Sequence, residues 1–343
     1  MGNASDERVV VPAELVGCGW DDLCVQQLIK RWPDRPFIDE ESIQKAEEDG
    51  RFSLFNLELG VYLFFTDAAS FMARYGMPKS AGPIVLSRAV FFGAYHQDVE
   101  RFQGAVIGEL DVASRFDRWT SQLGQAEWTH EIGGTIRKAR WRTDAYLVDV
   151  SFSAGGDCRL VSLMPVYCPE AVVLQAEAKQ RHLALPTPAQ VVEAIGTPLS
   201  DPALAAAFQP VDFASKLHEA SSHGEMDFSR DDGFELYASP ADALALDRPI
   251  NVSAGAPCLS GSRYRSDLDF KSVQWQGSLP YDITFDDGPD TVVAKVGRVA
   301  DRENFDEMQG SHRWHFGNYD LHVLYSLAED HVYRVTLLGR TKD

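Results

Sequence analysis

The chain repeats itself at a spacing of 173 residues. When the sequence is shifted by this spacing and compared with itself, eight residues fall on identical partners: Gly60 with Gly233, Gln103 with Gln276, Gly104 with Gly277, Asp117 with Asp290, Gly124 with Gly297, Trp141 with Trp314, Tyr146 with Tyr319 and Val150 with Val323. A looser match at a spacing of 179 joins Val16–Asp22 to Ile195–Asp201. Tryptophans and glycines on one register indicate two copies of one structural unit.

The repeat divides the 343 residues into three parts. We expect a first unit over residues 1–170, a helical linker over 171–185 and a second unit over 186–343. The linker sequence AVVLQAEAKQRHLA is typical of a helix, and the prolines that follow it, Pro186 and Pro188, end it.

Helix signals open the second unit. Thr187 fits a helix N-cap and Pro188 the first helical position, while Gly196 can end that helix. A second helix is expected from Ser200 or Asp201. The first unit has the same order of signals, so each unit is predicted to be α+β, with helices packed on an antiparallel β-sheet.

Alternation of apolar and polar residues predicts the strands. In the first unit they are Val61–Phe65, Ala89–Phe92, Val106–Leu110, Ile136–Trp141, Leu147–Phe152 and Leu160–Met164. In the second they are residues 233–237, Leu268–Trp275, Ile283–Phe285, Ser311–Phe316, Leu321–Tyr325 and Val332–Leu338. A short helix precedes the last three strands in each unit, at Phe116–Leu123 and Asp290–Lys295. The Ser/Gly-rich segment 259–262 is predicted to be a loop.

The charge balance restricts the partners. There are 51 acidic and 32 basic residues, a net charge of −19. Such a chain is repelled by nucleic acids and anionic membranes, and it attracts basic proteins. Solubility alone also accounts for acidity of this kind.

Three further features favour a cytoplasmic protein. The N-terminal residues show no secretory signal, and no apolar run approaches the ~20 residues of a membrane span. The five cysteines are scattered and odd in number, which suits reduced thiols.

The chemistry-bearing residues indicate no catalytic or metal site, and we expect no cofactor. His312 and His315 are three apart, so on a strand they face opposite sides and cannot easily share a metal, even with His322 nearby. Nucleophile-elbow and phosphate-loop motifs are absent. Cys18, between two glycines, is either a reactive low-pKa thiolate or a buried cysteine.

The repeated aromatic residues allow two interpretations. Trp141 and Trp314, with Tyr146 and Tyr319, either plug each sheet against its helix or stand exposed as partner anchors.

Acidic residues are dense in two loops of the second unit, a first over Asp282–Asp290 and a second over Asp301–Glu307. We take these loops, with two flanking residues as anchors, to be the candidate partner surface; the other interpretation is a solvated loop. The residues are Asp282, Asp286, Asp287, Asp290, Asp301, Glu303, Asp306 and Glu307, with Tyr281 and His315.

The segment from Gln276 to Phe285, followed by a helix ending at Gly297 and by aromatic strands around Trp314 and Tyr319, resembles a known unit. It is similar to the helix-plus-meander units of BamE-like and β-lactamase-inhibitor-like proteins. It is more similar still to the tandem-repeat immunity proteins that bacteria encode beside toxins of the type VI secretion and polymorphic kinds. The first unit departs from the pattern, with Val106-Ile107 in place of Leu279-Pro280. The resemblance implies a binder and not a catalyst.

The function expected from the sequence is a cytoplasmic immunity protein that occludes a cognate toxin with a basic cleft, most simply a nuclease, without binding nucleic acid or membrane itself. Two alternatives stay open. One is an adaptor or structural protein for another cytosolic partner, and the other is an enzyme without a familiar motif, using a pair such as His322 and Asp320. The oligomeric state is left open by the sequence.

Overall fold

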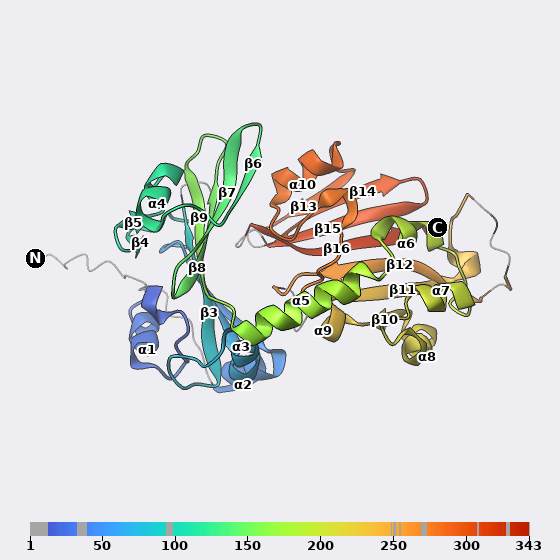
Figure 1. Ribbon diagram of the computed structural model, residues 1–343, viewed down its shortest axis with the longest axis horizontal. Helices are drawn as coiled ribbons and strands as arrows, with labels where there is room; N and C mark the ends of the chain where they lie inside the picture. Colours follow the sequence, from blue (N-terminus) through green and yellow to red (C-terminus); the bar gives the residue numbers. More distant parts are fainter. Residues whose placement is uncertain are drawn as a thin grey trace, which may run out of the picture. The chain divides into compact units, whose positions relative to one another are not determined.

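The protein consists of two compact units, which meet in the sequence between Val172 and Val173. The structure is a computed structural model (Figure 1) and describes residues 13–32, 40–93, 99–247, 249, 252–253, 255–268, 273–306, 309–326 and 330–342. Unit 1 precedes this boundary and unit 2 follows it, and each is described by itself.

Unit 1 contains a seven-stranded antiparallel sheet in the order β1-β2-β3-β9-β8-β7-β6. Its strands are β1 (Arg51–Asn56), β2 (Val61–Asp67), β3 (Ile84–Phe92), β6 (Trp128–Ile132), β7 (Thr135–Arg142), β8 (Tyr146–Phe152) and β9 (Cys158–Pro165). A separate two-stranded hairpin is formed by β4 (Ala105–Ile107) and β5 (Leu110–Asp111).

Unit 2 contains a second seven-stranded sheet in the order β10-β11-β12-β16-β15-β14-β13. Its strands are β10 (Glu225–Asp227), β11 (Phe234–Pro240), β12 (Pro257–Arg265), β13 (Arg302–Phe305), β14 (Gln309–Phe316), β15 (Tyr319–Ser326) and β16 (His331–Gly339). The connection order is the same in both sheets, strand for strand. This confirms the prediction of an α+β fold with two similar units.

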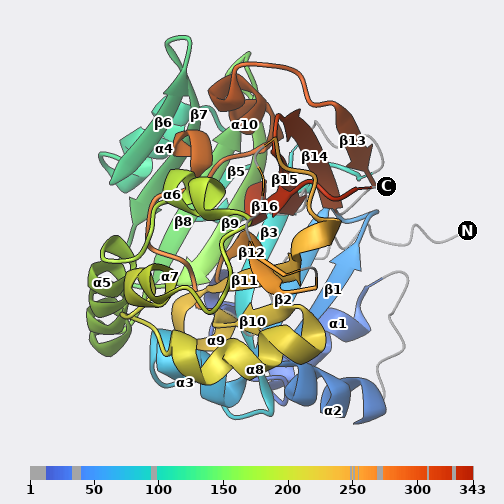
Figure 2. The ribbon, with the colours of Figure 1, turned by 90° about the vertical axis from the view of Figure 1, so that its right-hand side faces the viewer.

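Helices of each unit contact the sheet of that unit. Unit 1 has η1 (Ala13–Leu15), α1 (Leu23–Lys30), α2 (Glu40–Asp49), α3 (Ala68–Tyr75) and α4 (Phe116–Leu123). Unit 2 has α6 (Pro188–Ala194), α7 (Pro202–Ala207), α8 (Phe213–His223), α9 (Ser229–Asp232), η2 (Ala241–Ala243), η3 (Pro280–Asp282) and α10 (Pro289–Val296), and α5 (Pro169–Leu183) crosses the boundary. Figure 2 shows α8 beside β10.

Local sequence explains the start of unit 2. The hydroxyl of Thr187 accepts a hydrogen bond from the Gln190 amide N–H, and the Gln190 side chain accepts one in return from the Thr187 N–H, 2.8 Å away. This capping box satisfies two amides that a helix start leaves open. Asp201 caps α7 in a similar way, through the N–H of Ala203.

The repeated tryptophans belong to the core. Trp141 and Trp314 are 1% and 0% exposed. Each indole N–H donates to a backbone carbonyl just past the end of the short helix, Gly124 O at 3.0 Å and Arg298 O at 3.1 Å. Each tryptophan therefore ties its sheet to the helix packed on it, in the same way in both units.

The glycine pair Gly60 and Gly233 marks a second shared contact. Both have positive φ, 63° and 67°. A Cβ on either residue would lie about 2 Å from a carbonyl oxygen of the following long loop, 2.1 Å from Glu100 O and 2.2 Å from Val273 O. Those two carbonyls are themselves 173 residues apart, so the close approach repeats along with the glycines.

The looser match at a spacing of 179 also has a structural basis. The N–H of Gly17 donates to Leu86 O, and the N–H of Gly196 donates to Leu259 O, at 2.8 and 2.7 Å. The segment at the start of each unit thus pairs with the equivalent strand, β3 or β12.

The predicted strands Leu268–Trp275 and Ile283–Phe285 are wrong, and Ile283–Phe285 forms part of the loop between η3 and α10. Leu268 and residues 273–275 lie outside any strand, and 269–272 are outside the described residues. The strand of this part of the sheet is β12, at the segment predicted to be a loop. Small serines on its buried face, such as Ser262, carry no apolar signal, although the alternation with Arg263 and Arg265 is regular.

The linker is helical, as α5, and its C-terminal end is anchored in unit 2. The ring of His182 is fully buried and stacks on Trp275, with centroids 4.3 Å apart. Its Nδ1 accepts a hydrogen bond from the Gln276 N–H at 2.9 Å. Its Nε2 lies 3.5 Å from a carboxylate oxygen of Asp232, which Arg181 also contacts.

The close approach at Gly233 yields a stability prediction. Gly233→Ala is expected to lower the free energy of unfolding by about 3 kcal/mol, because the new methyl group meets backbone that cannot move aside. Gly297→Ala is the matched control: φ is also positive there, at 76°, but a Cβ would meet nothing within 4 Å. That change should cost about 1 kcal/mol. Equal losses in urea unfolding would contradict the assignment.

Candidate functional site

The structure places the predicted acidic residues in different environments. Asp282, Asp290, Asp301, Glu303 and Asp306 are exposed. Asp286 is half-buried, Asp287 is buried, and Glu307 lies outside the described residues.

Asp287 has a structural role. Its carboxylate accepts a hydrogen bond from the Thr284 N–H at 2.7 Å and lies 2.8 Å from Lys295 Nζ. Lys295, near the end of α10, also donates to Asp282 O at 2.7 Å. This carboxylate therefore closes the loop before α10 and, with its charge matched by a lysine, is unsuited to contacting a partner.

Asp301 organises the start of the second loop. One of its carboxylate oxygens accepts from the His315 N–H and from Arg298, both at 2.7 Å. The pKa of Asp301 is lowered chiefly by the backbone hydrogen bond from His315, with help from the Arg298 charge. Arg298 also donates to the carbonyl of His315 at 2.8 Å, so this guanidinium is held by two acceptors.

The predicted anchor His315 is half-buried and contacts a buried aspartate. Asp320, on β15, is 4% exposed. Its carboxylate lies 2.7 Å from His315 Nδ1 and 3.0 Å from Arg313 Nε. Burial raises the pKa of Asp320, but the hydrogen bonds from His315 and Arg313 outweigh it, so the pKa lies below its usual value. His315, and not His322, is therefore the histidine that contacts this aspartate.

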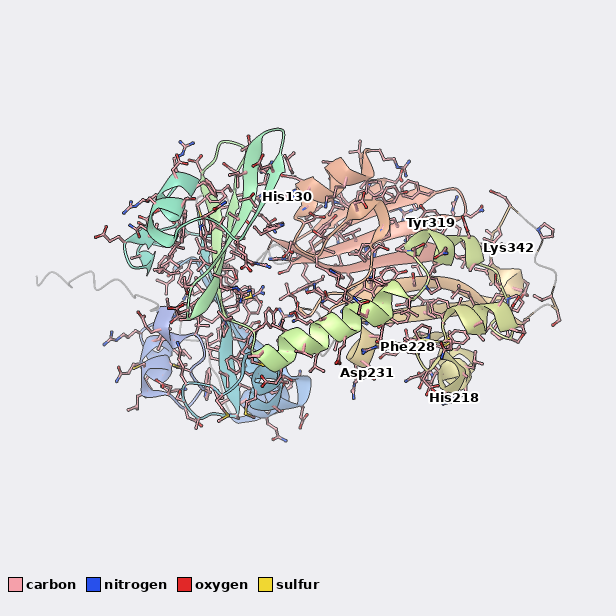
Figure 3. The ribbon with its side chains drawn as sticks, viewed as in Figure 1. His130, His218, Phe228, Asp231, Tyr319 and Lys342 are labelled. Carbon is pink, nitrogen blue, oxygen red and sulfur yellow. The ribbon has the colours of Figure 1, made fainter. Side chains whose placement is uncertain are left out.

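The other predicted anchor, Tyr281, lies in an aromatic cluster formed by Tyr281, Phe316 and Tyr319. The Tyr281 and Phe316 rings are 5.4 Å apart and tilted by 24°, and Phe316 and Tyr319 are 5.3 Å apart and tilted by 20°. The two tyrosine hydroxyls form a hydrogen bond of 3.0 Å. Tyr319, which Figure 3 labels, lies at the start of β15.

Arg298 joins the aromatic cluster to the second acidic loop. Its guanidinium carbon lies 4.6 Å from the centre of the Phe316 ring, within the range of a cation–π interaction. The residue thus contacts Asp301 at one end of the cluster and Phe316 within it. Burial and the hydrogen bond from Tyr281 raise the pKa of Tyr319, so this hydroxyl is neutral at physiological pH.

Sequence reasoning missed Arg298 and Phe316. The repeat carried a signal for both residues, because neither is repeated in unit 1. The residues 173 positions before Arg298 and Phe316 are Gln125 and Thr143. Among the residues of the cluster, Tyr319 alone has an aromatic counterpart, Tyr146. Side chains that differ between the two copies are candidates for a function that only one copy has.

A second aromatic group lies at the sheet edge, around His312. Its Nδ1 is 3.1 Å from the Tyr325 hydroxyl, and its ring packs against Phe305 at 5.0 Å. Burial lowers the pKa of His312, although the nearby carboxylates of Glu303 and Asp290 oppose this. His312 and His315 thus have separate partners on opposite faces of β14.

The other predicted chemistry can be located as well. In the described part of the chain, no group of three or more His, Cys, Asp or Glu side chains is placed to hold a metal ion. Burial raises the pKa of the Cys18 thiol, with a contribution from Asp22, which is the opposite of an activated thiolate. No helix within the described ranges is long and apolar enough to span a membrane.

No family model, curated protein or solved structure matches this chain.

The contrast between buried and exposed aspartates can be measured. Asp287→Asn should lower the free energy of unfolding by about 2 kcal/mol, because it leaves Lys295 without its charge partner. The exposed, isosteric change Asp282→Asn should stay within about 0.5 kcal/mol of the parent protein. Urea unfolding of both variants checks this. If Asp287→Asn leaves the free energy of unfolding unchanged, the structural role of Asp287 is refuted.

His312 predicts a pH dependence. Its pKa is lowered from 6.5 in the folded state, so the unfolded chain binds the proton more readily. Stability contributed by the neutral ring is therefore present above pH 6.5 and lost as the pH falls below it. His312→Phe keeps an aromatic ring without a titrating group and should show a smaller loss between pH 7.5 and 5.5. His322, whose pKa burial also lowers, keeps some slope in the variant.

Unfolding midpoints in urea at the two pH values give the comparison. The variant will be less stable at both, because the Tyr325 hydroxyl loses its partner. The difference between the midpoints is the relevant quantity, and equal differences in parent and variant would contradict the prediction.

Proposed function

We propose that this protein is an immunity protein, which binds a cognate toxin in the cytosol and covers the toxin's basic cleft. The observation that carries the proposal is the surface of unit 2 at its two acidic loops. Five exposed carboxylates lie there, although Asp290 belongs to the first turn of α10 and Glu303 to strand β13 rather than to a loop. The aromatic cluster joins the two acidic segments, because Tyr281 before α10 and Arg298 after it both contact Phe316.

Three of the five exposed carboxylates are specific to unit 2, whereas Asp282 and Asp290 correspond to Glu109 and Asp117 of unit 1. The residues 173 positions before Asp301, Glu303 and Asp306 are Trp128, His130 and Gly133. In unit 1 the short helix region also carries Arg115 and Arg118. The surface of unit 2 also contains the exposed Arg298 and Arg302, but its five exposed carboxylates outnumber them, and a predominantly acidic surface is suited to a basic partner.

The mechanism is occlusion. A nuclease holds phosphates with lysines and arginines, and the acidic loops offer carboxylates in place of those phosphates. The aromatic rings supply contact area at the centre, where binding energy concentrates. Because the residues around Arg298 and Asp301 are already held by hydrogen bonds, little ordering remains to be done on binding.

Two general features support the proposal. The net charge of −19 accelerates encounter with a basic protein and opposes binding to nucleic acid. All five cysteines are free, which suits a reducing compartment.

The first experiment is capture of the toxin. The protein is co-expressed with the product of the neighbouring gene, and copurification at a defined stoichiometry supports the proposal. Failure of the two proteins to form a complex would overturn it.

The acidic loops predict the kinetics of that complex. Changing Asp282, Asp290, Glu303 and Asp306 to their amides should slow association about tenfold at low salt and flatten its salt dependence. The control changes four exposed carboxylates of unit 1, Asp21, Glu58, Asp117 and Asp144, with the same total charge. Stopped-flow rates from 20 mM to 500 mM salt distinguish a local surface from net charge, and equal effects of the two quadruple variants would contradict the assignment.

A further inference from the structure

Tyr281 adopts a backbone conformation that an amino acid with a side chain rarely takes. Its φ is 57° and its ψ 27°, and the next residue, Asp282, has a φ of 55°. Two successive left-handed residues other than glycine make this turn strained. Strain of this kind persists where the surroundings hold it, and it is concentrated at functional sites.

Unit 1 makes the corresponding turn without strain. The residue 173 positions before Tyr281 is Gly108, whose φ is 56°. A Cβ on Gly108 would meet nothing within 4 Å, so the space there is open. The fold therefore needs a left-handed residue at this position and not a tyrosine. Unit 2 has a tyrosine at a position where glycine would adopt the positive φ without strain.

The contacts of Tyr281 hold its ring at the surface. Phe316 and the hydroxyl of Tyr319 fix its position, yet 36% of the residue is exposed. Phe316 in turn is capped by Arg298. The aromatic cluster is thus rigid on its inner side and open on the side of Tyr281.

Unit 1 shows that the counterpart of Tyr319, the neighbour of Tyr281 in the cluster, contacts a cation. Its tyrosine, Tyr146, has the ammonium of Lys79 lying 5.0 Å from the ring centre and 3.2 Å from the hydroxyl. The residue 173 positions after Lys79 is Val252. Unit 2 therefore has no lysine at the position of Lys79, and the hydroxyl of Tyr319, the counterpart of Tyr146, is bonded to the hydroxyl of Tyr281 instead.

We propose that the exposed ring of Tyr281 receives an arginine side chain from the partner protein. This inference rests on the proposed function, since it names the chemistry that the binding surface recognises. A guanidinium stacks on the ring, as that of Arg298 does on Phe316. The exposed carboxylate of Asp282, one residue along the chain, supplies the opposite charge. Arginine suits this pairing better than lysine, because its planar group stacks and hydrogen-bonds at once.

The test uses a small probe and the intact chain. Protein with ¹³C-labelled tyrosine rings is titrated with N-acetyl-arginine amide and, in parallel, with N-acetyl-citrulline amide, which has nearly the same shape and no charge. We expect saturable shifts of the Tyr281 and Tyr319 ring signals with arginine, and binding about fivefold weaker with citrulline. Equal binding of the two probes, or shifts that do not saturate, would overturn the proposal.

Two variants separate recognition from packing. Tyr281→Gly restores the residue that unit 1 uses, so it should leave the melting temperature unchanged or raise it, while the arginine response of Tyr319 disappears. Tyr281→Leu keeps apolar bulk without a π-system and should also lose the response. Met77→Gly removes an exposed apolar side chain in unit 1, and it should leave the arginine response of Tyr319 unchanged. A large drop in melting temperature for Tyr281→Gly would mean that the ring is a packing residue, and the proposal would fail.

These measurements do not involve the toxin. An intact arginine response without toxin capture would overturn the proposed function and leave the arginine site in place. Toxin capture that Tyr281→Gly does not weaken would overturn this inference and leave the proposed function in place.

Discussion

The bond between a buried tryptophan and the end of a short helix organises each unit. Trp141 and Trp314 lie in the second strand of the last meander, β7 or β14, and each donates to a carbonyl beyond α4 or α10. A buried indole N–H without a partner would be costly, so the helix end must come to the sheet at this point. The loops on either side of the helix are positioned as a consequence, and these loops carry the candidate surface of unit 2.

On this shared frame the two units have diverged at the surface. Unit 1 keeps glycine at the left-handed turn before α4 and covers its tyrosine with its own Lys79. Unit 2 has Tyr281 in that turn, with Phe316 and Arg298 to support it. Unit 1 turns here with a single left-handed residue, Gly108, in the hairpin between β4 and β5, whereas unit 2 has two successive left-handed residues in η3, so the strain at Tyr281 is specific to unit 2. A difference of this kind between two copies of one unit points to a role outside the fold.

The proposed surface combines two effects that act at different stages of binding. Exposed carboxylates act over distance and set the rate of encounter, and salt weakens them. Rings held in place act at contact and set how long the complex lasts. Asp287 and Asp320 contribute to neither stage directly, because both are buried with basic partners. Their part is to hold the loop before α10 and the end of β14 in the geometry that the surface needs.

The sequence by itself determined the two units and their α+β class, and it left open whether the repeated tryptophans are buried. These features depend on local periodicity, on caps such as Thr187 and on glycines that recur wherever backbone approaches backbone, as at Gly60 and Gly233. Only the tertiary structure decided which acidic residues are exposed, because Asp287 is buried by a lysine eight residues away on another element. It also decided that Tyr281, Phe316 and Arg298 form one cluster. Their contacts join segments up to 35 residues apart, and no local pattern encodes such a meeting.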